Sequence, residues 1–538
     1  MKVLVERIKR TVCTPRYHVL CLLLAVLFGG SKHFASPDLS VFLLIAYGAG
    51  FYLLMLAVII PVIDLIPEKF ALFGEVSSKN RFLLYFAAFF LLWLPFLIIK
   101  YPGAVQPDTW EMISYYEHGI INDKHSVLYC LFLNWFVHMG RNAGSADAGL
   151  FIFLILQHVC CCFCFAYAVS FLDRLGTRPV IQYSVAAITL FNPYIIGYVG
   201  VALKDIPYSA FALLLTILIA EFCFYPERFG KSFIKMVMLA VTVMLMCFMR
   251  SNGIYVVALT AAALIPLIIK NRKCVRFALV MLAGVVLFLI SNTVILKASG
   301  TIILENNYKE ALSIPFQQTA RYVRDHDDDI TDSEREIIDR DLNIETLVSR
   351  YDPRISDPVK NSYAGNKSGI PEYLGVWGKQ LLRHPLCYVA ATWEQNHSLM
   401  LPVKSASNTS FYKDYCTAYE LDICYGGGGT VIEGLFTSPE SLKDAKDTVI
   451  YFCEGILQVP VLSAFWNVAC CTILLLVISY MALVKKRSDS LGYLMPLLSA
   501  LLITIAGPVI YGHPRYMFPV ILALPFVMIF EFKKGEKL

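Results

Sequence analysis

Charged residues are scarce in this chain. Asp, Glu, Lys and Arg make up only 16% of its 538 residues, whereas 57% are apolar. Soluble domains contain about 25% charged residues, so the composition excludes an ordinary soluble protein and indicates many membrane spans. The net charge of +5 is small, and we therefore expect no nucleic-acid partner.

The sequence also lacks a nucleotide-binding motif and an internal repeat. The glycine run at 426–429 has neither the Lys nor the Ser or Thr of a phosphate loop, so we interpret it as a hinge or loop. The sixteen cysteines lie mostly in apolar runs such as "CCCFC" at 160–164, which is typical of packing residues rather than a metal site. Cys416 and Cys424 are candidates for a disulfide, which their spacing alone does not decide.

Twelve apolar runs are long enough to cross about 30 Å of hydrocarbon, which takes about 20 helical residues. We therefore expect an all-α polytopic membrane protein with about twelve transmembrane helices. The first run shows no convincing cleavage site for a signal peptide, so we expect it to be retained. The runs cover residues 17–32, 41–65, 82–100, 149–171, 179–199, 206–225, 232–249, 253–269, 276–296, 457–484, 490–511 and 515–532.

Basic residues predict the orientation of these spans. With the N-terminus inside, twenty-two Lys and Arg flank the spans on the cytoplasmic side and seven on the outer side, as the positive-inside rule requires. The apolar stretch from Ser126 to Gly140 is short and carries Asn134 and His138, so we expect it to lie in the outer interface rather than to cross. Both termini are then cytoplasmic.

Polarity along the chain predicts four parts. The polar segment 297–456 is long enough for a folded domain, with helical signals in "SIPFQQTARYVRDH", "TDSEREIIDRDL" and "PEYLGVWGKQLLRH". We expect two additional N-terminal transmembrane helices in 1–81, a transmembrane module in 82–296 with a first outer loop at 101–148, a mainly helical or mixed extracytoplasmic soluble domain in 297–456, and C-terminal transmembrane helices with a short cytoplasmic tail in 457–538.

Four polar motifs stand at the outer ends of spans. Charged residues beside apolar spans are costly unless they are paired, hydrated or functional. Two carboxylates with Lys, two Arg and two His suit a negatively charged ligand together with an acid–base group. The residues are Asp108 and His125 in the first outer loop, Lys204 and Asp205 in "LKDIPY", Arg250 and Asn252 in "MRSNGIY", and His513 and Arg515 in "YGHPRYMFP".

Each of these residues also has a purely structural explanation. An Arg at a helix end can anchor the helix in the interface, Lys204 and Asp205 can form an exposed ion pair, and Asp108 can cap a helix. Their joint occurrence on one face of the membrane favours a functional site.

Two further patterns point to metals less directly. "DHDDDITDSERE" places Asp325, Asp327, Asp329 and Glu336 at the offsets of a calcium loop, but Ile330 occupies the position of the turning Gly. We interpret it as a solvated acidic patch. Glu394 and His397 in "WEQNHS" have the spacing of a helical metal pair without an evident third ligand, so we expect a structural role.

The motifs "YPG…D", "KHSVLY", "GYVGVALKD", "RSNGIY", "PFQQTAR" and "HPRYMFP", in this order and on this side of the membrane, resemble the GT-C superfamily of membrane glycosyltransferases. Lipid A aminoarabinose transferases and protein O-mannosyltransferases are among its members, and the likeness is strongest to a group of bacterial polytopic membrane proteins assigned to it. The resemblance extends roughly from Phe82 to Phe532. It implies catalytic roles for Asp108 and Asp205, and Ser126 stands where relatives tend to have Pro.

The resemblance implies a hexosyl- or pentosyltransferase that moves a sugar from a polyprenyl-phosphate carrier, without a nucleotide cofactor, to a cell-envelope glycan, lipid or protein acceptor. The donor phosphate would lie among His125, Lys204, Arg250, Asn252, His513 and Arg515, and a divalent cation is compatible with the site. Three alternatives remain open. They are a transporter or flippase of an anionic or lipid-linked substrate, a polysaccharide polymerase or ligase, and a receptor-like scaffold. The sugar, the acceptor, the stereochemical outcome and the oligomeric state do not follow from the sequence.

Overall fold

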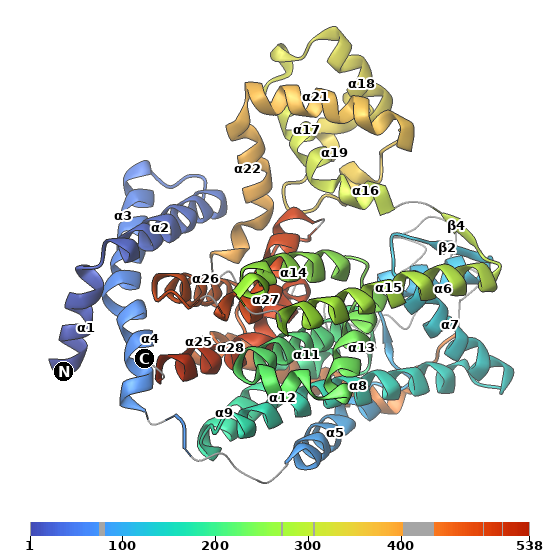
Figure 1. Cartoon of the computed structure of the whole chain (residues 1–538). Coiled ribbons are helices and arrows are strands. Elements are labelled where there is room, and N and C mark those ends of the chain that lie inside the picture. The colour runs from blue at the N-terminus through green and yellow to red at the C-terminus, as the bar shows by residue number, and fades with distance from the viewer. Residues whose placement is uncertain are drawn as a thin grey trace.

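The structure is a computed structural model that describes residues 2–70, 72–74, 81–270, 273–304, 307–401, 435–487, 489–507 and 509–536. Helices make up most of it (Figure 1), and the described residues contain two short parallel sheets of two strands each. A bundle of apolar helices carries a smaller helical unit on one end. The expectation of an all-α membrane protein is confirmed.

Seven helical segments among the described residues are long and apolar enough to cross a membrane. They are α2 (Pro15–Ala35), the segment Val41–Pro67 within α3 (Val41–Leu54), the π-helical turn η1 (Met55–Ile59) and α4 (Ile60–Lys69), α5 (Phe82–Ile99), α8 (Ala146–Arg174), α11 (Asp205–Phe224), Val275–Ser299 within α15 (Lys273–Ser299), and Pro514–Lys534, which comprises the 3-10 turn η8 (Pro514–Met517) and most of α28 (Phe518–Glu536).

Five shorter apolar helices fall in the other five expected runs. They are α9 (Pro179–Leu190), α13 (Phe233–Met249), α14 (Gly253–Lys270), α26 (Val468–Val484) and α27 (Ser490–Ala506). Length and composition therefore support seven crossings and do not confirm the expected count of about twelve. The stretch 126–140 forms α7 (Val127–Asn142), which belongs to neither group.

Two expected spans are interrupted for local reasons. In 179–199, α9 has 12 residues and is about 18 Å long, and a second helix, α10 (Pro193–Tyr198), follows. The side chain of Asn192 accepts hydrogen bonds from the backbone N–H groups of Tyr194 and Ile195, and Pro193 has no N–H, so the chain starts a new helix. The run 457–484 is likewise divided among α24 (Lys443–Gln458), α25 (Pro460–Ser463) and α26.

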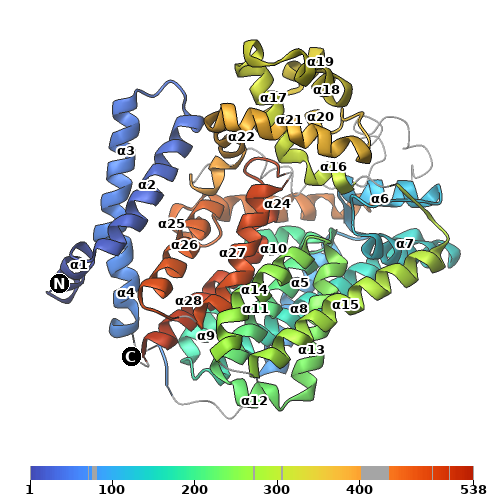
Figure 2. The same cartoon turned by 45° about the horizontal axis from the view of Figure 1, so that its top comes forward.

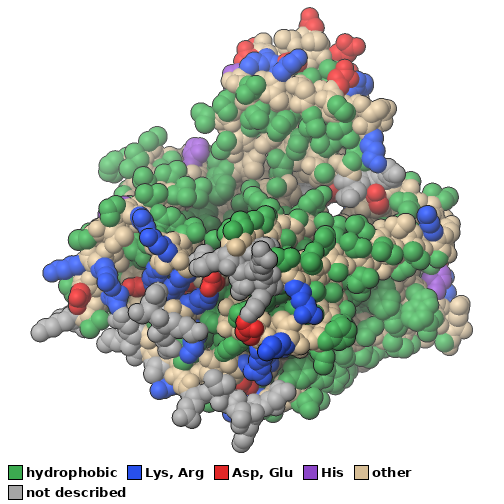
Figure 3. Space-filling view, viewed as in Figure 1, with side chains coloured by type: hydrophobic (Ala, Val, Ile, Leu, Met, Phe, Trp, Pro, Cys, Tyr) green, Lys and Arg blue, Asp and Glu red, His purple; other side chains and the backbone are tan. Residues whose placement is uncertain are grey.

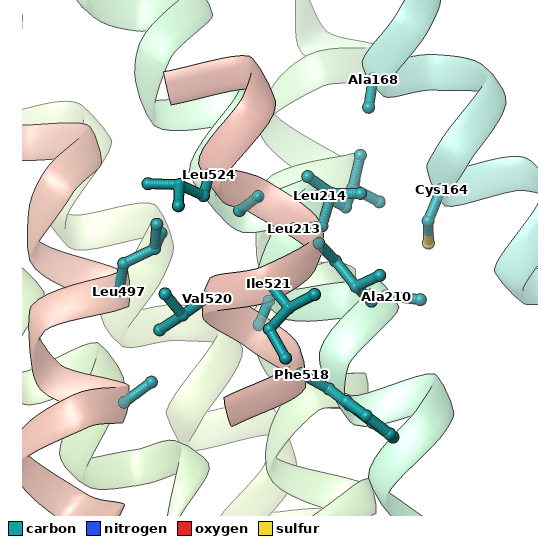
Figure 4. Packing of buried hydrophobic residues seen from close by; sticks show 14 of the residues in the cluster. Cys164, Ala168, Ala210, Leu213, Leu214, Leu497, Phe518, Val520, Ile521 and Leu524 are labelled. Carbon is teal, nitrogen blue, oxygen red and sulfur yellow. The ribbon is translucent and has the colours of Figure 1, made fainter. Parts of the chain in front are cut away.

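The centre of the bundle is α11, in which almost every residue is buried. A helix that is apolar on all sides requires partners on all sides. Figure 4 shows Leu213 and Leu214 of α11 in one cluster with residues of α28, such as Phe518 and Ile521, and α8 also packs against α11. By contrast, hydrophobic side chains cover much of the outside of the bundle (Figure 3), as expected for helices that face lipid.

The N-terminal helices lie at the edge of the bundle. After α1 (Lys2–Val12), α2 and α3 form a hairpin at one side of the molecule (Figure 2). At one end, Asp64 of α4 pairs with Arg7 of α1 at 2.8 Å and with Lys485 after α26 at 2.5 Å. The N-terminal and C-terminal parts of the chain are therefore joined on one side of the bundle.

Residues 307–399 form the helical unit above the bundle, called the outer unit because it lies outside the helix bundle. Its hydrophobic core is separate from that of the membrane helices and includes Phe316, Tyr322, Leu347, Tyr373 and Tyr388. The candidate disulfide pair Cys416 and Cys424 and the expected hinge or loop at 426–429 lie outside the described residues. The elements of the unit are α16 (Asn307–Ala311), α17 (Ser313–Asp325), η2 (Asp327–Asp329), α18 (Asp332–Leu342), α19 (Ile344–Arg350), α20 (Asp357–Lys360), η3 (Lys367–Gly369), α21 (Ile370–Arg383), α22 (Pro385–Asn396) and η4 (His397–Leu399), and η7 (Glu440–Leu442) follows before α24.

Candidate functional site

Two strand pairs bring distant loops together above the membrane helices. β1 (Ala104–Val105) runs parallel to β3 (Val201–Ala202), and β2 (Ile120–Asn122) runs parallel to β4 (Ile302–Leu304). The Thr109 hydroxyl also donates a hydrogen bond to the Ala202 carbonyl. The loop 101–148 is thereby fixed beside the loop before α11 and beside the segment that leads into the outer unit.

A cavity of about 840 Å³ opens between the bundle and the outer unit. Seven of the eight predicted site residues line it, namely Asp108, His125, Lys204, Asp205, Arg250, Asn252 and Arg515. His513 does not line the cavity. It lies directly behind the wall, where its Nδ1 accepts a hydrogen bond from the Arg515 backbone N–H. The structure therefore brings together motifs that are up to 407 positions apart in the sequence.

Asp108 occupies the middle of the charged wall. It is the second residue of α6 (Pro107–Glu117), and its Oδ2 lies 3.6 Å from Arg515 Nη1 and 4.0 Å from Lys204 Nζ. Burial would raise the pKa of Asp108, but Arg515, Lys204 and His125 outweigh that effect and hold it well below its usual range. The side chain remains 26% exposed, so an ionised carboxylate faces the cavity.

A tighter ion pair lies deeper. Arg250 Nη1 is 2.6 Å from Asp205 Oδ1, and the Asp205 side chain is only 3% exposed. The Arg250 guanidinium lies 5.8 Å and 5.9 Å from the ring centroids of Tyr208 and Tyr516. Tyr516 OH also accepts a hydrogen bond from Arg515. Arg250 is thus fixed by a short ion pair, whereas Arg515 meets its carboxylate at a longer distance.

A third group extends from Lys204 to the other side of the loop. Lys204 Nζ donates a 2.7 Å hydrogen bond to His125 Nδ1, and His125 Nε2 lies 3.5 Å from Glu111 Oε2. Burial lowers the pKa of His125, and the charge of Lys204 lowers it further. Burial opposes ionisation of Glu111, but His125 and Lys124 bring its pKa down to about 2. At neutral pH the histidine is therefore neutral and Glu111 is a carboxylate.

Glu111 was not among the predicted site residues. It lies three positions after Asp108 in α6, so the two share one helix face. Lys124 Nζ lies 2.7 Å from Glu111 Oε2, and Asn122 donates to Oε1 at 3.1 Å. The spacing of three residues from Asp108 is the feature of the sequence that could have indicated Glu111. Glu111 orients His125 and Lys124 rather than facing the cavity itself.

The outer unit supplies the upper wall of the cavity. Lys360 Nζ lies 2.8 Å from Glu310 Oε1 and 2.7 Å from Asp357 Oδ1, and Tyr308 and Lys367 line the same wall. No local pattern in the sequence marks these residues, because they reach the cavity only through the folding of the outer unit. The upper wall is polar and paired, whereas the wall around Asp108 has more cations than carboxylates.

The outer unit also holds the loop that carries Arg515. Gln395 at the end of α22 donates to the Val509 carbonyl at 2.6 Å. Tyr511 N–H donates to the Arg354 carbonyl at 2.9 Å, and Gly512 N–H donates to Ser398 Oγ at 3.2 Å. The loop is therefore attached to the outer unit by several backbone groups.

The two sequence patterns for which we expected a solvated acidic patch and a structural role form ion pairs and ring contacts in the structure. Glu394 pairs with Arg321, and the His397 ring lies against Tyr511, with centroids 4.5 Å apart, so both have structural contacts. In the acidic segment, Asp325 pairs with Arg324 at 2.7 Å and Asp327 with Arg335 at 2.8 Å. These arginines neutralise the carboxylates that a calcium loop would need.

Comparison with known proteins identifies a family and nothing more specific. Residues 114–537 match a family described as "Family of unknown function (DUF6020)". Asp108 lies just before the matched region, and the other seven predicted site residues lie within it. No curated protein and no solved structure matches the chain. Because the match covers well over half of its length, the chain belongs to the DUF6020 family.

Proposed function

We propose that this protein is a GT-C-type glycosyltransferase that moves a sugar from a polyprenyl-phosphate carrier to a glycan, lipid or protein acceptor at the outer face of the membrane. One observation carries the proposal. An ionised Asp108 faces a large cavity between Lys204 and Arg515, at 4.0 Å and 3.6 Å, without a short ion pair to either. A carboxylate beside two cations at the end of apolar helices suits a lipid phosphate and an acceptor hydroxyl.

The donor phosphate would bind Arg515 and Lys204. A guanidinium can hold two phosphate oxygens at once, and both cations stabilise the negative charge that grows as the lipid phosphate leaves. Asn252 and His125 line the same wall. Ala500 and Ile503 of α27 also line the cavity, and the polyprenyl tail would lie against these apolar side chains.

Beside Arg515 and Lys204, Asp108 is a weak base, because these two cations depress its pKa. A bound phosphate competes for both cations, so it raises the pKa of Asp108 toward the range in which a carboxylate accepts a proton. The acceptor oxygen then bonds to the anomeric carbon of the sugar while the bond from that carbon to the phosphate oxygen breaks. The hydroxyl proton passes to Asp108, and Asp205 positions Arg250.

The test is release of lipid phosphate by the purified full-length protein incubated with labelled undecaprenyl-phosphate hexoses and pentoses. We expect release with at least one donor when an acceptor extract is added, and loss of release in Asp108→Asn. Glu117→Gln is the matched control, because Glu117 lies at the opposite end of α6 and pairs with Arg141. Uptake of an intact lipid-linked or anionic substrate into proteoliposomes, with no release of lipid phosphate from any donor, would refute the proposed enzyme activity and indicate a transporter.

We also propose that the chain crosses the cell membrane twelve times, with both termini in the cytoplasm and the outer unit extracytoplasmic. The five shorter apolar helices bring the number to twelve, and α10 follows α9 directly in the chain. The pairs of Asp64 with Arg7 and Lys485 support placing the two ends of the chain on one side. Cysteines introduced at exposed positions 178 and 328 should react with impermeant reagents from opposite sides. Labelling of both from outside would refute this topology.

A further inference from the structure

A cluster of metal-ligating side chains lies in the outer unit, away from the cavity. One ligand atom each from His326, Asp329 and His384 lies within 4.8 Å of the other two. His384 Nε2 is 2.7 Å from Asp329 Oδ2. The rings of His326 and His384 stack with centroids 3.8 Å apart and an angle of 15° between their planes. None of the three residues lines the cavity around Asp108.

The fold places these residues at three chain turns. His326 follows the end of α17, Asp329 ends the turn η2, and His384 joins α21 to α22. Each turn is tied by a backbone hydrogen bond: His326 N–H to the Tyr322 carbonyl at 2.8 Å, Asp329 N–H to the His326 carbonyl at 3.1 Å, and His384 N–H to the Gln380 carbonyl at 3.0 Å. The three side chains therefore project from backbone that is already fixed.

Neighbouring side chains support the cluster. The buried Tyr322 ring packs against both histidines, at centroid distances of 5.4 Å from His326 and 5.5 Å from His384. Arg383 donates to the backbone carbonyl of Asp329 and pairs with Glu334. Arg383 thus holds the Asp329 backbone and leaves the Asp329 carboxylate directed toward the histidines. Such contacts around the ligands are what fix ligand orientation in metal sites.

We propose that His326, Asp329 and His384 bind a divalent transition-metal ion, with Zn²⁺ favoured by the ligand type. Two imidazole nitrogens and one carboxylate oxygen are ligands of zinc, whereas calcium takes six to eight oxygens. Three protein ligands leave the fourth tetrahedral position to water or an external ligand. The exposed fractions of Asp329 and His384, 53% and 31%, leave that position open to solvent.

Binding requires one histidine ring to turn out of the present stack, because a metal ion lies in the plane of each imidazole that coordinates it and rings 3.8 Å apart at 15° cannot both point to one ion. Zinc–ligand bonds of about 2.0–2.1 Å place tetrahedral ligand atoms roughly 3.3 Å apart. The present 2.7 Å contact between Asp329 and His384 is that of a direct hydrogen bond, and it would lengthen by rotation of two partly exposed side chains. The bound ion would then link the end of α17 to the junction of α21 and α22.

The test uses the full-length protein in detergent, treated with a chelator and then titrated with Zn²⁺ by calorimetry and with Co²⁺ by visible absorption. We expect one equivalent to bind and Co²⁺ to show the spectrum of a four-coordinate nitrogen–oxygen site. His326→Ala and His384→Ala should each weaken Zn²⁺ affinity by about 100-fold or more. Asp328→Asn is the matched control, because Asp328 lies in the same turn and outside the cluster, and it should bind like the wild type.

The thermal unfolding midpoints of the variants and the wild type are compared in the presence of chelator. No metal ion is then bound, so equal midpoints show that the substitutions leave the fold intact. The Co²⁺ spectrum of the wild-type protein tests the site even if a variant unfolds. Absence of saturable binding by the wild type, or wild-type affinity in both histidine variants, would overturn the proposal. Failure of the glycosyltransferase assay would leave it unaffected, because the two sites share no residue.

Discussion

Replacing Asp108 by Asn separates two effects that the structure predicts to be opposite in sign. The Asp108 carboxylate attracts Arg515 and Lys204, the two cations that we assign to the donor phosphate. The amide has nearly the same shape but no charge, so it no longer competes with the phosphate. The same change removes the group that takes the proton from the acceptor. We therefore expect tighter donor binding together with slower transfer.

The distances give the size of the binding effect. At 3.6 Å and 4.0 Å, Coulomb's law with an effective dielectric constant of about 20 gives roughly 4–5 kcal/mol of attraction per pair. Asp108 is 26% exposed, so water screens most of this, and about 1 kcal/mol per pair remains. Release of both cations would strengthen donor binding by about 1–2 kcal/mol, or roughly 5- to 30-fold. Loss of the general base should slow transfer by about 100-fold or more.

The assay is a single-turnover measurement of sugar transfer alongside equilibrium binding of the lipid-phosphate donor, for the wild type, Asp108→Asn and the control Glu117→Gln. A helix cap whose loss disturbs the loop would weaken binding and transfer together. The reasoning fails if Asp108→Asn binds donor more weakly than the wild type, or if it retains near-normal transfer.

Three further predictions concern the surrounding charges. Arg515→Ala should raise the KM for the donor more than Arg515→Lys, because the ammonium keeps the charge but loses two-point contact with phosphate; equal, near-normal steady-state kinetics in both would make Arg515 a membrane anchor. Arg250→Ala leaves Asp205 buried without its 2.6 Å partner and should cost about 3 kcal/mol of folding stability, measurable as a lower Tm that Asp205→Asn in the same chain partly restores. The pKa of Glu111, about 2, lies below the value of about 4.3 in the unfolded chain, so its contribution to stability is complete above about pH 4.3 and is lost as the pH falls toward 2. The Tm of Glu111→Gln should therefore vary less with pH across that range than the Tm of the wild type. An unchanged profile would show that Glu111 does not contribute.

Much of the candidate site could be predicted because membrane topology restricts where chain segments lie. Once the spans and their direction are assigned, the outer ends of α5, α13 and α28 and the start of α11 must occupy one level. Charged residues at that level, such as Lys204 and Arg250, are then expected to lie close together, because few other positions are open to them. The structure adds the pairing partners, which no motif indicates. Asp205 is committed to Arg250, and Asp108 is left beside Arg515.

Other features depend on tertiary contacts and escaped the sequence analysis. His326 and His384 stack although 58 positions separate them, and the acidic pattern that contains His326 and Asp329 gave no indication of His384. Lys360 reaches the cavity only because the outer unit folds over the bundle. The expected span 457–484 was wrong in extent because its apolar run continues through the break between α24 and α26, where Pro460 and Asn467 start new helices. A hydropathy profile depends only on side-chain polarity and therefore shows one continuous apolar run, although the backbone hydrogen bonding changes at Pro460 and Asn467.

The bonds between α22 and the loop before α28 also determine how far this protein can be divided. The carbonyl of Val509 and the N–H groups of Tyr511 and Gly512 find their partners in residues 354–398. A deletion of the outer unit would strand these backbone groups at the mouth of the bundle, each at a cost of about 1–3 kcal/mol where water cannot reach them. It would also release the segment that orients Arg515. The outer unit and the loop that carries Arg515 therefore depend on each other, and a shortened chain without the unit would need new partners for these backbone groups.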